Sequence, residues 1–81
     1  MIPREVFHDK ERPKEIVFVV EEAPEGGYVA HALGESIVTE ADDLHLLRVQ
    51  IIDAVRCHFT SEATRPQLIR LHHVKDEILA A

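Results

Sequence analysis

The histidines are the first residues of this chain whose type suggests chemistry. Six histidines occur in 81 residues, and imidazole nitrogens are common ligands of zinc and other metal ions. His72 and His73, with His31 or His58, would supply such ligands. Neighbouring residues of a strand point to opposite faces, however, so His72 and His73 cannot easily bind one ion. No His-x-His, His-x-x-x-His or HExxH pattern occurs, and we therefore expect structural histidines, no metal site and no cofactor.

A thiol and an imidazole also stand next to each other at Cys57 and His58. Consecutive side chains of a helix diverge by about 100° and do not face each other, so the pair does not form a nucleophile and its base. We expect Cys57 to be a packed thiol and His58 to be a hydrogen-bonded residue of the core or of an interface. Helix capping accounts for Asp42 and Asp43, and solvent exposure or an ion pair accounts for Asp53. The sequence predicts no catalytic residues.

The charge balance favours a protein partner over a nucleic acid. Nine Lys and Arg residues stand against fifteen Asp and Glu residues, which gives a formal charge of -6 at pH 7. Nucleic-acid binding depends on concentrated positive charge, whereas an acidic surface suits a basic protein. We expect no direct nucleic-acid binding.

The composition, with 46% hydrophobic and 30% charged residues, is that of one small globular domain. No apolar run approaches the roughly 18 to 20 residues that cross a bilayer, and no secretory signal is evident. We therefore expect a cytoplasmic protein without membrane contact. Because a chain of this length builds only a modest core, we also expect a homo-oligomer, most simply a dimer.

Three strands are predicted in the first half of the chain. Residues 15–22 are rich in β-branched side chains and suit a central strand largely covered on both faces. The Gly26-Gly27 turn leads to a second strand at residues 28–33, and a short turn leads to a third at residues 36–39. The result is an antiparallel meander. The charge-rich residues 1–14 show neither the alternation of a strand nor the periodicity of a helix, and they are expected to form an N-terminal arm.

One helix follows the meander. Asp42 is the expected N-cap, and a stripe of apolar residues at spacings of three and four is expected to face the sheet: Leu44, Leu47, Ile51, Val55 and Phe59. Leu46, Val49 and Cys57 fall outside this stripe. We expect these three residues to contact another subunit.

A polar loop then returns the chain to a fourth strand at residues 67–74, which contains Leu71. The last residues, 75–81, are expected either to extend that strand, to form a last turn or to hang free. A free sheet edge nearby would invite pairing between subunits. The predicted fold is α+β in the order β-β-β-α-β, with one domain over residues 15–81.

Part of this chain resembles the HicB-like antitoxin family. The resemblance spans residues 15–59 and rests on the Gly-Gly-Tyr-Val-Ala segment at residues 26–30, the short strand at residues 36–39 and the Asp-led helix start at residues 41–44. It implies a truncated relative of the ribonuclease H arrangement that lacks nuclease residues. It also implies an antitoxin that covers a small basic HicA-type mRNA-cleaving toxin.

Two departures from that family pattern are visible. The proline-rich turn between the second and third strands is reduced to residues 33–35, and His45 stands where a glutamate commonly completes the first helical turn. Residues 65–81 leave no room for the DNA-binding segment that many HicB-like proteins carry. We therefore expect a stand-alone core.

Our prediction is a non-enzymatic HicB-like protein that oligomerises, either as an antitoxin-type module that covers a small basic toxin or as an orphan protein-binding module. The candidate partner contacts are acidic: Glu21, Glu22, Glu25, Glu35, Glu40 and Asp53. The candidate oligomer contacts are apolar: Leu46, Val49, Cys57 and Leu71. The alternative is a small regulatory or ligand-binding domain without a toxin partner, and an enzyme that uses the histidines is the third hypothesis.

Overall fold

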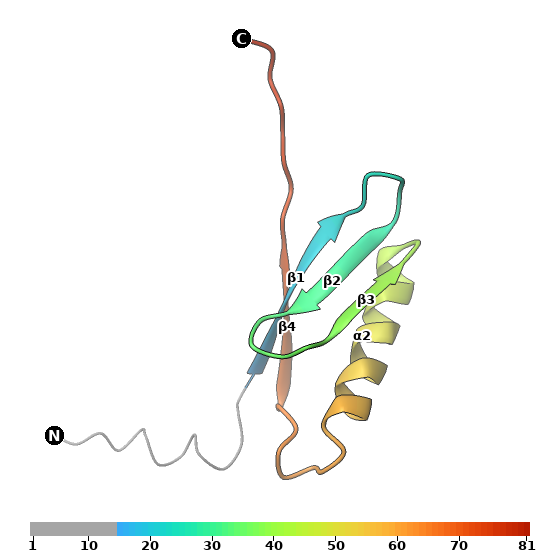
Figure 1. Ribbon diagram of the computed structural model, residues 1–81, viewed down its shortest axis with the longest axis vertical. Helices are drawn as coiled ribbons and strands as arrows, with labels where there is room; N and C mark the ends of the chain where they lie inside the picture. The colour runs from blue at the N-terminus through green and yellow to red at the C-terminus, as the bar shows by residue number, and fades with distance from the viewer. Residues whose placement is uncertain (1–14) are drawn as a thin grey trace, which may run out of the picture.

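The computed structural model describes residues 15–81, and the expected N-terminal arm of residues 1–14 lies outside the described residues. The elements follow the predicted order (Figure 1). They are β1 (Glu15–Glu22), β2 (Tyr28–Ala32), β3 (Val38–Ala41), α2 (Leu44–His58) and β4 (Leu68–His73). The α+β fold and the β-β-β-α-β order are therefore confirmed.

The four strands form one sheet in the order β3-β2-β1-β4. β1 pairs antiparallel with β2, and β2 pairs antiparallel with β3, as expected for a meander. β4 runs parallel to β1, because α2 carries the chain back to the end of the sheet where β1 begins. β1 is thus an inner strand, as predicted, and β4 is an edge strand of the described sheet.

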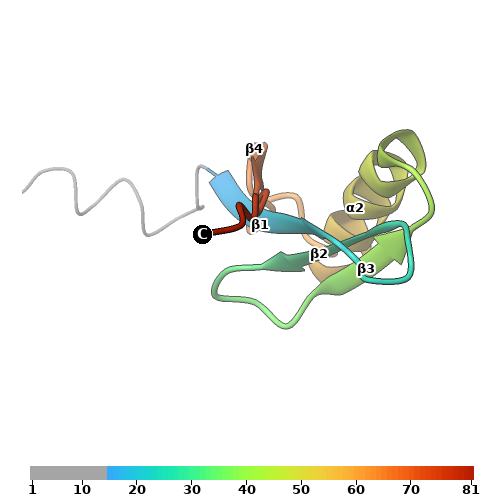
Figure 2. The same cartoon turned by 90° about the horizontal axis from the view of Figure 1, so that it is seen from above.

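The helix covers one face of this sheet (Figure 2). Along β1, Ile16, Phe18 and Val20 are buried, whereas Val17 and Val19 on the opposite face are only half-buried. The prediction that both faces of β1 are largely covered is therefore confirmed in full only for the face that meets the helix. A single helix buries a single face, and no second described element packs against the other one, which we call the open face.

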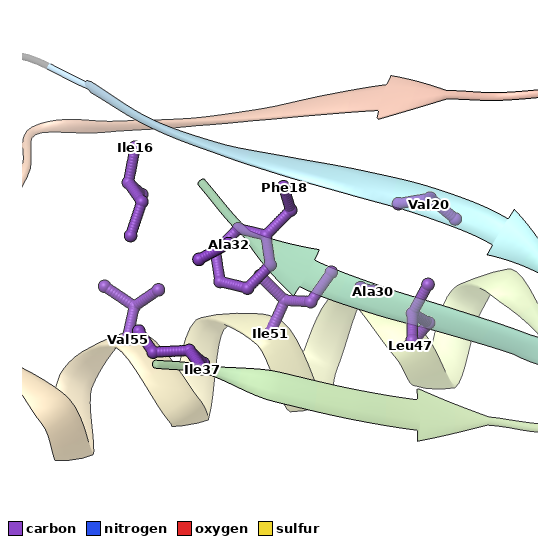
Figure 3. Close-up of a cluster of buried hydrophobic side chains, with 9 residues drawn as sticks. All are labelled: Ile16, Phe18, Val20, Ala30, Ala32, Ile37, Leu47, Ile51 and Val55. Atoms are coloured by element: carbon purple, nitrogen blue, oxygen red, sulfur yellow. The ribbon is translucent and has the colours of Figure 1, made fainter. Parts of the chain in front are cut away.

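The core lies between β1, β2 and α2 (Figure 3). Phe18 projects from β1 towards Ile51 of the helix, and both side chains are almost fully buried. Ala30 and Ala32 of β2 are also buried beneath the helix. These short side chains let the helix approach the sheet closely, and Leu47 has zero exposure.

The boundaries of three strands differ from the sequence prediction, and β2 ends at Ala32, one residue earlier than expected. β3 occupies Val38–Ala41 instead of residues 36–39, because pairing with β2 begins where Val38 meets His31. The preceding residue, Ile37, is buried in the core, and its carbonyl accepts a hydrogen bond from the Ala32 amide at 2.9 Å. The loop thus continues two residues further before the ladder starts.

The fourth strand is confirmed at Leu68–His73, slightly shorter than residues 67–74. Residues 74–81 are neither helix nor strand. They continue away from the end of β4 and from the rest of the molecule (Figure 1). The Val74 amide still donates to the Val20 carbonyl at 2.9 Å, so the chain leaves the sheet after this residue.

The helix begins one residue later than predicted. Asp43, not Asp42, is the N-cap, with extended backbone angles of φ -138° and ψ 167°. Its Oδ1 accepts a hydrogen bond from the Leu46 amide at 2.7 Å, which satisfies one of the free N–H groups of the first turn. The Asp42 prediction is wrong because both residues are good caps, and only the backbone path out of β3 selects between them.

Replacing Asp43 with alanine should lower the free energy of unfolding by about 1 kcal/mol, the usual cost of removing an N-cap side chain. Urea denaturation followed by circular dichroism measures this difference. The matched control is Asp42→Ala, which should change the free energy by less than about 0.5 kcal/mol. Equal losses from both variants would show that the capping assignment is wrong.

Candidate functional site

The histidines do not converge. The register places His72 on the open face and His73 on the helix face of β4, as the period of a strand requires. His31 of β2 also lies on the open face, and Val19 of β1 stands between His31 and His72. Within residues 15–81, no three His, Cys, Asp or Glu side chains are grouped so that they could hold a metal ion.

His58 and Cys57 lie at the exposed end of the helix. The His58 Nε2 is 3.0 Å from Oε1 of Glu35, and its ring contacts Phe59 edge-on at a centroid distance of 4.8 Å. The predicted hydrogen bond is present, but His58 is exposed and is not a core residue. Cys57 is exposed, so the prediction of a packed thiol is wrong for the single chain.

Four of the predicted acidic contacts gather at one end of the sheet. All four are exposed and belong to β1, the turn after it and β3: Glu21, Glu22, Glu25 and Glu40. We call this set the acidic end. Glu21 and Glu40 both lie beside Val29 on the open face, one on each neighbouring strand. Two carboxylates therefore flank a half-buried aliphatic side chain.

The two remaining acidic candidates lie elsewhere. Glu35 belongs to the loop between β2 and β3, at the opposite end of the strands, and is paired with His58. Asp53 is exposed on α2. The predicted acidic set is therefore not one surface, since strand pairing unites four members and separates two.

The open face also carries one ordered ion pair. Arg70 of β4 donates from Nε to both carboxylate oxygens of Glu15, at 3.1 and 3.2 Å. The hydrogen bond to Glu15, followed by the attraction of its charge, raises the pKa of Arg70 above its ordinary value. Arg70 stays charged and is directed at its neighbour on β1.

An apolar groove lies on the helix face between α2 and β4. Its walls are Arg48, Ile51 and Ile52 from the helix and Ile69 and Leu71 from β4, and it holds about 190 Å³. We call it the α2/β4 groove. A second hollow of about 300 Å³ shares Ile52 and Ile69 with it and continues towards Pro66.

The groove exists because the helix sits over the other half of the sheet. Gln50 of α2 accepts a hydrogen bond from the Thr39 hydroxyl of β3 at 2.8 Å, which ties the helix to the edge opposite β4. The helix-facing side chains of β4 are therefore incompletely covered. Ile69 and Leu71 remain only partly buried.

The predicted oligomer contacts are divided by this arrangement. Leu71 lines the groove, whereas Leu46, Val49 and Cys57 are exposed on the helix away from it. Ile52 is 45% exposed and lines both hollows, but it is not among the predicted oligomer contacts. The signal was available, because Ile52 is a large apolar residue outside the predicted stripe.

The fold and these surfaces define a small α+β protein with one helix on one four-stranded sheet, an acidic end and an open apolar groove. The chain belongs to the UPF0150 family. It is 40% identical over 70 residues to a UPF0150 protein of Thermotoga maritima, which covers 86% of this chain and 97% of that protein. It is 49% identical over 53 residues to a UPF0150 protein of Archaeoglobus fulgidus, which covers 65% of this chain and 77% of that protein.

Two further comparisons found no counterpart. No family model matches the chain, and no solved structure gives a significant match. Among the described residues, no helix combines the length and the apolar character that a bilayer crossing requires.

Proposed function

We propose that this UPF0150 protein is a cytoplasmic, non-catalytic protein-binding module of the HicB-like antitoxin type, which forms a homodimer and covers a small basic toxin. The observation that carries this proposal is the acidic end, where four exposed carboxylates from two strands and a turn share one region. The formal charge of the whole chain, -6, is negative like that of the acidic end. The β-β-β-α-β order is also the one that the HicB resemblance implies.

The chemistry of the acidic end suits lysine and arginine side chains. Such side chains combine an aliphatic stem with a charged head. Val29, flanked by Glu21 and Glu40, offers a matching apolar spot between two carboxylates. Complementary charge accelerates encounter and selects the partner more than it adds affinity, so binding should weaken as salt increases.

Reversing both charges beside Val29 should reduce binding of the basic partner at least about tenfold, because close charge pairs across an interface couple by roughly 1.5 to 7 kcal/mol. The test is affinity co-purification from the native cells with the Glu21→Lys/Glu40→Lys variant, followed by mass spectrometry of intact complexes. Both positions are exposed, so the variant should fold. Circular dichroism checks that expectation.

The matched control is Asp53→Lys/Glu62→Lys, which makes the same change in net charge at two exposed acids outside the acidic end. It should retain the partner. Loss of the partner from both variants would point to net charge alone and would contradict a defined site. Recovery of only a homo-oligomer from the unchanged chain would reject the toxin and leave the small regulatory or ligand-binding domain.

The volumes of the two hollows favour a protein partner over a small ligand. Small-molecule sites usually enclose about 300 to 1,000 Å³. The α2/β4 groove holds about 190 Å³ and the adjoining hollow about 300 Å³. Both are therefore at or below the lower end of that range.

A further inference from the structure

The most exposed large apolar side chains of the described residues include Ile78 at 92% and Leu79 at 78%. They belong to residues 74–81, which extend away from the body of the molecule (Figure 1). Two adjacent aliphatic side chains in water are unfavourable, and such exposure commonly marks a contact surface. The segment therefore needs a covering surface.

The segment is poorly suited to fold back onto its own chain. A return along β4 requires a tight turn between His73 and Ile78. The intervening residues, Val74-Lys75-Asp76-Glu77, include no Gly, Pro, Asn or Ser, although Asp76 is compatible with a turn. An extended path to a neighbouring molecule requires no turn at all.

We infer that residues 74–81 of a second copy lie along β4 and place Leu79 in the α2/β4 groove, and that the two copies exchange these segments reciprocally. The inference rests on the proposed homodimer and names its interface. It does not depend on a basic partner.

The free edge of β4 provides the backbone partners for this segment. β4 ends the strand order of the described sheet, and an edge strand presents N–H and C=O groups that can pair with another chain. Two copies related by a two-fold axis perpendicular to the sheet would pair their β4 edges antiparallel. Each segment then runs beside its partner's β4.

The alternation of side chains directs Leu79 to the correct face. Ile69 and Leu71 face the helix, and in an extended chain Glu77 and Leu79 continue that parity. A two-fold axis perpendicular to the sheet keeps the helix faces of both copies on the same side. Leu79 therefore arrives on the face that holds the partner's groove.

The charges agree with this placement. Arg48 borders the groove and Arg56 borders the adjoining hollow, and both are exposed. Glu77, on the same face as Leu79, would approach Arg48, whereas Arg56 lies about 12 Å further along the helix, beyond Leu79. The segment thus offers one aliphatic and one acidic side chain to a groove that is apolar with basic margins.

The Leu79→Asp variant of the full chain tests the interface through its mass in solution. Light scattering during size-exclusion chromatography should give twice the 9.2 kDa chain mass for the unchanged protein and the single mass for the variant. The control is Val38→Asp, which is 70% exposed on β3 at the opposite edge and should stay dimeric. A monomeric unchanged protein, or a Leu79→Asp dimer, would overturn the inference.

Disulfide trapping identifies the groove and the donor chain. In a Cys57→Ser background, Ile52→Cys with Leu79→Cys should give a covalent dimer on a non-reducing gel. Leu46→Cys with Leu79→Cys should not, since Leu46 lies about 120° around the helix from Ile52. An internal disulfide in a monomer would overturn the exchange, and equal trapping by both pairs would overturn the groove.

The two proposals fail separately. The Glu40→Lys variant should remain a dimer while its binding of the basic partner weakens, because Glu40 lies on β3, at the edge of the sheet opposite β4. If the dimer fails the trapping test but the basic protein still co-purifies, the interface is wrong and the proposed function stands.

Discussion

Replacing Phe18 with alanine should lower the free energy of unfolding by about 3 to 5 kcal/mol, the range for removing a buried aromatic side chain. Phe18 has zero exposure, lies on the inner strand β1 and projects towards the helix (Figure 3). Its removal leaves a cavity between sheet and helix that neither rigid element can close. Small domains are stable by only about 5 to 15 kcal/mol, so a large part of the stability would be lost.

Urea denaturation at fixed protein concentration measures this effect, since the apparent stability of an oligomer depends on concentration. The matched control is Val17→Ala in the same strand. Val17 points to the open face and is only half-buried, so the loss should be no more than about 1 kcal/mol. Similar losses at the two positions would mean that the open face is buried as deeply as the core.

Replacing Gly27 with alanine should lower the free energy of unfolding by about 2 to 5 kcal/mol, from two costs that add. The backbone at Gly27 has φ +83°, and a left-handed conformation costs other residues about 1 to 2 kcal/mol. A Cβ atom here would also lie 2.9 Å from the carbonyl oxygen of Ala41. This oxygen belongs to β3, so it cannot move away as a flexible side chain would, and overpacking of this kind costs about 1 to 3 kcal/mol.

A substitution at the neighbouring glycine separates the cost of the backbone conformation from the cost of the steric contact. Gly26 has φ +105°, but a Cβ atom at Gly26 would meet nothing within 4 Å. Gly26→Ala should therefore show the conformational cost alone. Thermal or urea denaturation of both variants gives the comparison, and a Gly26→Ala variant as unstable as Gly27→Ala would show that close approach to β3 is unimportant.

These two positions explain how the proposed binding surfaces keep their geometry. Phe18 holds the helix on the sheet, and Gly27 allows the β1–β2 turn to lie against β3. The acidic end combines residues of those same three segments. A loss of partner binding by Gly27→Ala would therefore report a displaced surface as well as a less stable fold.

The sequence by itself determined the local elements. The three-and-four spacing placed Leu47, Ile51 and Val55 towards the sheet, as the structure confirms. The period of two likewise puts Tyr28, Ala30 and Ala32 on one face of β2. These patterns are local, because each depends on the repeat of one backbone conformation. Element order and fold class follow from such repeats together with the turn residues.

Choices between adjacent positions were less accessible to sequence reasoning. Asp43 caps the helix instead of Asp42, and β3 starts at Val38 instead of residue 36. Either choice satisfies the local propensities. The register between β2 and β3 makes the selection, and that register includes residues distant in the chain.

The tertiary structure alone decided which surfaces exist. The sequence could not show that Glu35 is separated from Glu40, that β1 has an open face or that Leu71 faces a groove beside Ile52. Each outcome depends on the strand order β3-β2-β1-β4 and on the helix lying towards β3. Strand order and helix position are set by the sum of many long-range contacts, whereas a sequence pattern records only the periodicity of one segment at a time.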